Sequence, residues 1–123
     1  IKNMEFKVSA QSVRIAPRKV RLVAGLIRNK TTKHALLVLS TCNKRAASVV
    51  TKLLKSAIAN AAHTAQVAPE ALSVGMIRVD GGPMLKRYDS RAMGRAEVIR
   101  KRISTIHLSL TDSPKSVKHN AKA

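Results

Sequence analysis

The chain has 123 residues, 45% of them apolar, which is enough for one folded domain with a core. Its formal net charge of +18 destabilises a compact chain unless a polyanion neutralises it, and no apolar stretch approaches the roughly 18 residues that span a bilayer. Because Phe6 and Tyr88 are the only aromatic residues, stacking of single-stranded bases on several rings is excluded, which leaves binding through phosphates, shape and Arg.

The first segment predicts a strand followed by a helix. From Phe6 to Val13 apolar and polar residues alternate, which is typical of a half-buried strand. Pro17 suits the first position of a helix, where its missing N–H does no harm. The apolar residues that follow recur at helical spacing: Val20, Val23, Ala24 and Ile27.

This predicted helix also carries a basic face. Its cations are Arg18, Lys19, Arg21 and Arg28. Two interpretations stay open: the solvated side of an amphipathic helix, or a surface that binds phosphate groups. The overall charge favours phosphate binding.

Two more helices are predicted. Thr32 is expected as the N-cap of a short helix from Lys33 to Leu39. A long helix follows at about 44–62, and His63 is expected just past its end. The apolar stripe of the long helix is Ala46, Val50, Leu53, Leu54, Ala57, Ile58 and Ala61. The one cysteine, Cys42, suits a reducing compartment and a structural role.

Two long strands are predicted in the second half, at Leu72–Val79 and Glu97–Leu110. Towards the end of the second strand apolar and polar residues alternate cleanly. Ile99 and Ile103 stand at odd-numbered positions, whereas the apolar residues of this alternation stand at even-numbered ones, so a regular strand would place them on the other face. We therefore expect a bulge or a strong twist between Ile103 and Ile106.

Between these strands lies a turn-rich stretch, 80–102, around which the chain is organised. It is far longer than the roughly two to five residues of an ordinary hairpin loop, and it has few apolar residues to pack on a core. Its cations are Lys86, Arg87, Arg91, Arg95, Arg100, Lys101 and Arg102. We predict a long hairpin arm that is ordered by an acidic partner around it.

The order of the elements predicts an α+β fold, with a small antiparallel sheet of about three strands packed on three helices and a long extended β-hairpin arm. We expect one globular domain at 1–112, with the arm at about 80–102. Residues 113–123 are predicted to be a basic flexible tail.

The sequence shows no pattern of catalytic or metal-binding residues. The six acids are scattered, and no two suggest shared acid–base chemistry. The histidines lack a second ligand at metal spacing, and Gly81-Gly82-Pro83 lacks the Lys and Ser/Thr of a phosphate-binding loop. We therefore expect no enzyme, no metal and no cofactor.

Three segments carry a resemblance to a known family. They are APRKVRLVAGLIR within Ser12–Arg28, LKSAIANAAH at Leu54–His63, and VDGGPMLKRYDSRAMGRA followed by KRISTIHLSL. In this order, and over the chain to about Asp112, they resemble the L-twenty-two family of large-subunit ribosomal proteins. The resemblance implies a structural constituent of the large ribosomal subunit that binds ribosomal RNA. It also implies that the basic hairpin reaches the wall of the polypeptide exit tunnel.

The resemblance also implies partners and site residues. The partners are large-subunit ribosomal RNA, neighbouring large-subunit proteins and the nascent polypeptide, with no membrane and no homo-oligomer. The location is the cytoplasm, on a bacterial ribosome, with an organellar ribosome left open. The implied RNA contacts are Arg14, Arg18, Lys19, Arg21, Lys86, Arg87, Arg91, Arg95, Arg100, Lys101 and Arg102. The implied tip at the tunnel is Tyr88, Asp89, Ser90, Ala92, Met93 and Gly94.

The tip departs from the family, in which bacterial relatives often have proline in place of Ser90 and a basic residue in place of Met93. Two functions of other classes compete with the ribosomal one. The first is a protein-interaction module whose basic hairpin docks on an acidic partner. The second is a DNA-architectural protein with its arm in the minor groove, for which Met93 is the one candidate apolar wedge.

Overall fold

The computed structural model describes residues 4–112. Its strands are β1 (Glu5–Val13), β2 (Ser73–Gly81), β3 (Leu85–Ser90), β4 (Ala96–Lys101) and β5 (Ser104–Thr111). Its helices are α1 (Pro17–Ile27), α2 (Thr32–Thr41) and α3 (Arg45–Ala65), with short 3-10 turns η1 (Pro69–Ala71) and η2 (Ala92–Gly94). The tail predicted at 113–123 lies outside the described residues.

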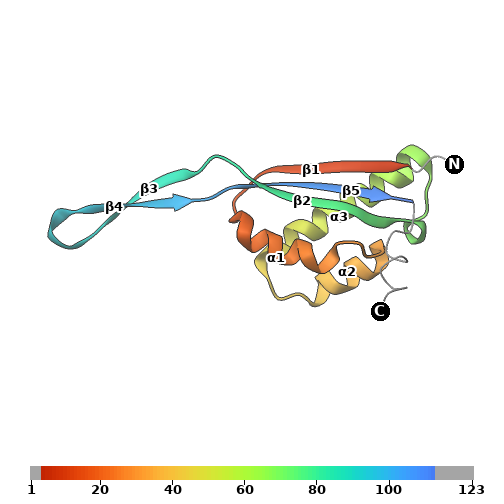
Figure 1. Cartoon of the computed structure of the whole chain (residues 1–123), viewed down its shortest axis with the longest axis horizontal. Helices are drawn as coiled ribbons and strands as arrows, with labels where there is room; N and C mark the ends of the chain where they lie inside the picture. Colours follow the sequence, from red (N-terminus) through yellow and green to blue (C-terminus); the bar gives the residue numbers. More distant parts are fainter. Residues whose placement is uncertain (1–3, 113–123) are drawn as a thin grey trace.

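The fold is a sheet covered on one face by helices, with an arm that extends away from it (Figure 1). Strands β1, β5 and β2 form a three-stranded antiparallel sheet in that order, and β3 and β4 form a separate two-stranded antiparallel ladder. The predicted α+β fold, with an antiparallel sheet of three strands packed on three helices, is confirmed.

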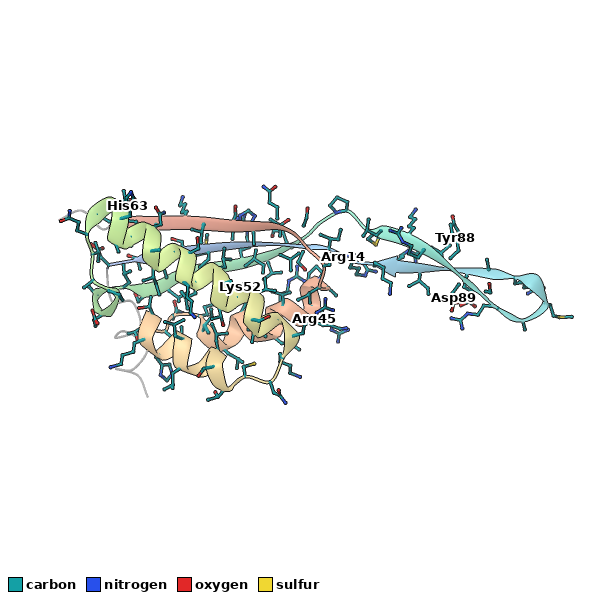
Figure 2. The ribbon with its side chains drawn as sticks, turned by 180° about the vertical axis from the view of Figure 1, so that it is seen from behind. Arg14, Arg45, Lys52, His63, Tyr88 and Asp89 are labelled. Atoms are coloured by element: carbon teal, nitrogen blue, oxygen red, sulfur yellow. The ribbon has the colours of Figure 1, made fainter. Side chains whose placement is uncertain are left out.

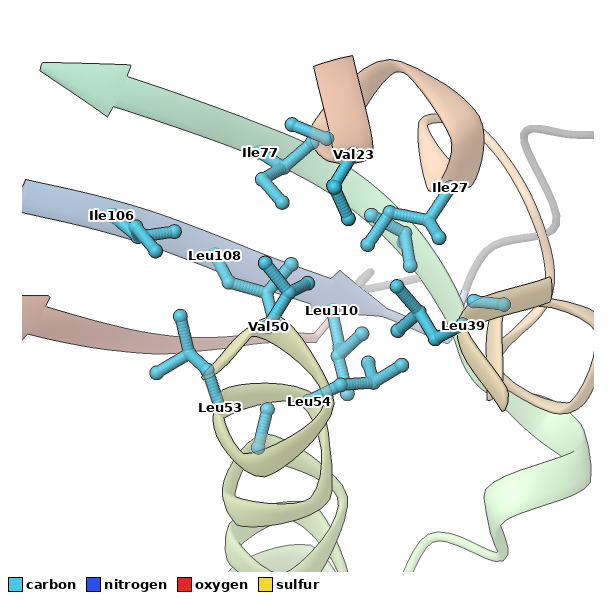
Figure 3. Packing of buried hydrophobic residues seen from close by; sticks show 14 of the residues in the cluster. Val23, Ile27, Leu39, Val50, Leu53, Leu54, Ile77, Ile106, Leu108 and Leu110 are labelled. Carbon is cyan, nitrogen blue, oxygen red and sulfur yellow. The ribbon is translucent and has the colours of Figure 1, made fainter. Parts of the chain in front are cut away.

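The core lies between the sheet and helices α1 and α3 (Figure 3). The predicted stripe of α1 is fully buried: Val20, Val23, Ala24 and Ile27. In α3 the predicted stripe is buried except for Ile58, which is half-buried. The sheet contributes the side chains of alternate residues on its covered face: Phe6, Val74, Ile77, Val79, Ile106, Leu108 and Leu110. Cys42 is a half-buried free thiol that packs against this core.

The helix ends differ from the predicted ones in two places. The N-cap of α2 is Thr31, whose hydroxyl accepts a hydrogen bond from the His34 N–H at 3.3 Å. Thr32 is instead buried and donates its hydroxyl to the carbonyl of Pro69 at 2.6 Å, so the prediction of Thr32 as the cap was wrong. Helix α3 continues to Ala65, which places His63 within its last turn rather than past its end.

The returning strand is two strands rather than one. Pairing stops at Arg102 and Ile103, where the partner of the chain changes from β3 in the arm to β2 in the body. An irregularity lies within the predicted span: in the pairing of β1 with β5 the register shifts between Ala10 and Val13, opposite Ile106 and Ser104. The predicted irregularity is therefore present at this position, but the extra residue belongs to the partner strand β1 and not to the returning strand. A second register shift lies in β2, at Gly75, where an added Cβ would stand 3.0 Å from the Thr111 methyl group.

The arm has no core of its own. From Gly82 to Ile103 no residue is buried, although six residue pairs join β3 to β4. At its root the Gly82 N–H donates to the Ile103 carbonyl at 2.7 Å, which joins the two strands where they leave the body. The body must therefore supply the folding free energy, because apolar burial is its main source.

We expect a single truncation in the core to show this division. Leu54→Ala removes a fully buried side chain of α3 and should lower the free energy of unfolding by about 2–5 kcal/mol. Leu37→Ala makes the same chemical change on α2 at a side chain that is 63% exposed, and should change it by about 0.5 kcal/mol or less. Urea denaturation followed by circular dichroism measures both, and equal losses would contradict the assignment of the core.

Candidate nucleic-acid interface

The predicted arm cations lie on both faces of the arm. Directly opposed residues of an antiparallel ladder share a face, so Lys86 and Arg100 lie together on one side. Arg87 lies on the other side, opposite Ile99. All of the predicted arm cations are exposed: Lys86, Arg87, Arg91, Arg95, Arg100, Lys101 and Arg102. An arm with cations on both faces is suited to a polyanion that surrounds it.

The tip of the arm is closed by Arg91. Asp89 and Glu97 oppose each other across the ladder, and two like charges in this position repel. The Arg91 guanidinium lies between them, with Nε 3.0 Å from the Glu97 carboxylate and a terminal nitrogen 3.6 Å from that of Asp89. The Arg91 N–H also donates to the Arg95 carbonyl at 2.6 Å. Arg91 was predicted only as an RNA contact, and the structure shows that it also holds the tip together.

The residues beyond Arg91 turn the chain sharply. Met93 has a φ of 61° and Gly94 a φ of 72°, so both lie in the left-handed region. Glycine adopts this conformation freely, whereas methionine does so at a cost. The Met93 side chain is 96% exposed and contributes nothing to a core, so it is displayed outward from the tip.

The basic face of α1 divides into two kinds of residue. Arg14, Arg18 and Lys19 are exposed at the end of the body from which the arm leaves; Figure 2 labels Arg14 there. The Arg21 guanidinium instead donates to the Val79 carbonyl through two nitrogens, at 3.2 and 3.0 Å. Arg28 donates to the Ile77 carbonyl at 3.0 Å. Part of the predicted RNA-binding face is therefore also engaged in binding the backbone of β2.

A hollow at the root of the arm brings together cations that are far apart in the sequence. Its volume is about 780 Å³, and its lining comes from the segment before α1, the start of α1, the start of α3 and the end of β4. Arg14, Lys19 and Arg100–Arg102 were predicted as site residues and meet here. Lys44 and Arg45 complete the lining and were not predicted. Figure 2 shows Arg45 at the same end of the body as Arg14.

One sequence signal could have identified Lys44 and Arg45. Helices favour acidic residues in their first turn because the N-terminus carries a partial positive charge. Neither α1 nor α3 has an acid there, and α3 begins with Arg45 immediately after Lys44. Cations at a helix N-terminus lower the stability of the helix. Their presence here therefore favours an interaction with a negatively charged partner.

Residues 4–112 contain no group of three or more His, Cys, Asp or Glu side chains that could hold a metal ion. In the same range, the helices are all too short or too polar to cross a membrane.

Comparison with known proteins gives a consistent assignment. Residues 8–111, from β1 through the arm to the end of β5, match the family model described as ribosomal protein L22p/L17e. The chain is also similar to the large ribosomal subunit protein uL22 of Desulforamulus reducens. The two are 47% identical over 109 residues, which cover 89% of this chain and 96% of that protein. The chain therefore belongs to the ribosomal protein L22p/L17e family, and it is a structural, non-enzymatic protein of the large ribosomal subunit.

Proposed function

We propose that the chain binds large-subunit ribosomal RNA through its arm and the adjoining end of its body, and that the arm reaches the wall of the polypeptide exit tunnel. The observation that carries this proposal is the arm itself, which exposes its cations on both faces and has no buried residue between Gly82 and Ile103. Such a segment gains little from the hydrophobic effect when the protein is free. Neutralised phosphates and released counterions would supply the missing free energy.

Most of the proposed RNA contacts are exposed cations, whereas two of them also bind protein atoms. Lys86, Arg87 and Arg95 are exposed along the arm, and Arg100–Arg102 are exposed at its root. Arg14, Arg18 and Lys19 extend the same basic surface onto the body. Arg21 and Arg91 already bind protein atoms. Because a guanidinium has five N–H groups, each would bind RNA through the N–H groups that do not bond to the protein.

The tip residues are proposed to form part of the tunnel wall. Ser90, Ala92 and Gly94 are small enough to let the backbone pass close to RNA, and Met93 presents an apolar side chain outward. Tyr88 and Asp89 lie just before them on β3, where Tyr88 is 73% exposed. A nascent polypeptide in the tunnel would pass this surface. We further propose that 1–112 acts as one domain and that the protein works on a cytoplasmic ribosome beside other large-subunit proteins.

The alternative of a protein-interaction module has less support. Both the alternative and the ribosomal function account for a basic hairpin, but family membership places the chain in a ribosomal subunit. The DNA-architectural alternative needs an apolar wedge at the tip, and Met93 alone would have to serve.

Removing the arm charges should weaken RNA binding without unfolding the body. We expect the triple variant Arg87→Ala, Arg91→Ala, Arg95→Ala to keep the thermal melt of the body in circular dichroism, because none of the three side chains is buried and the ion pairs of Arg91 lie at the tip of the arm, outside the core. Its affinity for large-subunit ribosomal RNA should fall. The slope of log affinity against log salt should become shallower by about 0.7–0.9 for each phosphate that the variant no longer neutralises.

The matched control removes three charges from the helices of the body. Lys33→Ala, Lys52→Ala, Lys55→Ala alters exposed residues of α2 and α3, and it should change the slope much less. If the affinity of both triple variants fell equally, RNA binding would depend on the net charge of the protein alone, and the arm would have no special role.

The tunnel-wall assignment predicts contact between Met93 and the nascent chain. With Met93 replaced by a photo-crosslinking residue in ribosomes stalled during synthesis, ultraviolet light should join the protein to a radiolabelled nascent peptide. The same probe at Lys55, an exposed residue of α3, should give no such product. Crosslinks only to RNA or to other proteins from Met93 would count against the assignment.

A further inference from the structure

The hollow at the root of the arm has a charge that the protein itself leaves uncompensated. Its cations are Arg14, Lys19, Lys44, Arg45 and the run Arg100–Arg102, and no acid is among the residues that line it. So many like charges around one space repel each other, and the repulsion grows as the local dielectric constant falls. Negative charges in the space between them would relieve this repulsion.

Two helices direct their positive ends into the same region. Helix α1 begins at Pro17 with Ala16 as N-cap, and α3 begins at Arg45 with Lys44 as N-cap. Neither N-cap side chain accepts a hydrogen bond from the helix, and neither first turn contains an acid. The helix ends therefore add to the positive field of the side chains rather than cancelling it.

The size and walls of the hollow indicate what fills it. Its volume of about 780 Å³ lies in the upper part of the range of ligand pockets, about 300–1,000 Å³, and exceeds what a single phosphate group needs. The lining also contains apolar side chains, including Leu22, which is 63% exposed, and half-buried Ile103. Phosphates joined by apolar sugar faces match such a lining better than separate inorganic anions would.

The framework of the hollow is fixed by hydrogen bonds. The hydroxyl of Ser104, which is fully buried, donates to the Ile15 carbonyl and joins β5 to the segment that leads into α1. Lys19 and Val20 donate their N–H groups to the Ala16 carbonyl at 3.0 and 3.2 Å and fix the first turn of α1. The wall formed by the segment before α1 and by the first turn of α1 is therefore held in place before any ligand binds.

We propose that this hollow is a binding site for a sharply bent segment of RNA backbone, which places several phosphates in one space between α1, α3 and the root of the arm. The proposal rests on the ribosomal RNA binding proposed above and assigns a separate part of it to Lys44 and Arg45. RNA in this site contacts Arg100–Arg102 at the same time as the two helices. It therefore holds the root of the arm against the body.

The test uses two double variants of the full chain that remove equal charge from one helix. Lys44→Ala, Arg45→Ala removes two positive charges from the wall of the hollow. Lys52→Ala, Lys55→Ala removes two positive charges from the exposed face of α3, further along the helix. Circular dichroism melts serve to check that both double variants fold. Affinity for large-subunit ribosomal RNA is measured across a salt series, and hydroxyl-radical footprinting locates the RNA that each variant protects.

We expect the hollow variant to reduce the salt slope by about 1.4–1.8, the value for two phosphates at about 0.7–0.9 each. It should also fail to protect one RNA segment that the triple arm variant still protects. The variant Lys44→Arg, Arg45→Lys keeps both charges and should keep the slope and the protection. The Lys52 and Lys55 control should keep both as well.

The outcomes separate this proposal from the one on which it rests. A wild-type chain without salt-dependent preference for ribosomal RNA would overturn both proposals. If the wild type binds and the arm variant is weakened, but the hollow variant behaves like the Lys52 and Lys55 control, the hollow proposal alone fails. That second result is also what a site for an acidic protein segment would give, because the RNA slope and footprint would not change.

Discussion

The packing of α1 and α3 on one face of the three-stranded sheet is the interaction on which the rest of the structure depends. The buried residues all belong to this layer or to the segments that border it, and from Gly82 to Ile103 none is buried. The body must hold its shape against the repulsion of a strongly positive chain, and it must also anchor an arm that adds no apolar burial. The hydrogen bond between Gly82 and Ile103 joins the two segments that leave the body, so the arm continues in the direction of β2 and β5.

Features set by local spacing could be predicted from the sequence. The stripes of α1 and α3 recur every three or four residues, and the alternation in β5 has a period of two, so each is visible without knowledge of its partners. What depended on a distant neighbour could not be predicted in the same way. Thr31 and Thr32 are chemically alike, and only the nearby Pro69 carbonyl decides which of them caps α2. The irregularity near Ile103–Ile106 was visible in the sequence, but its extra residue lies in β1, which is a property of the pairing and not of the returning strand.

The same distinction applies to the candidate site. The run of cations in the arm is continuous in sequence, so its residues were identified together. Arg91 was counted as a free cation because the register that sets Asp89 opposite Glu97 is a property of the folded hairpin. Lys44 and Arg45 were missed because they join Arg14 and Arg100–Arg102 only in three dimensions. All three helices lack an acid in the first turn, so the local sign of this arrangement is the pair of cations, Lys44 and Arg45, at the start of α3.

The hydrogen bonds from Arg21 and Arg28 to β2 have a consequence for the edge of the sheet. Strand β2 lies at the edge of its sheet, where unpaired backbone groups are a template for strands of other molecules. On this edge the Leu72 carbonyl and the Val74 N–H pair with the backbone of Thr32 and Lys30, and the bulge at Gly75 then shifts the parity. The next carbonyls on this side, of Ile77 and Val79, are occupied by Arg28 and Arg21. The two arginine side chains therefore occupy carbonyl groups of this edge that an added strand would otherwise use.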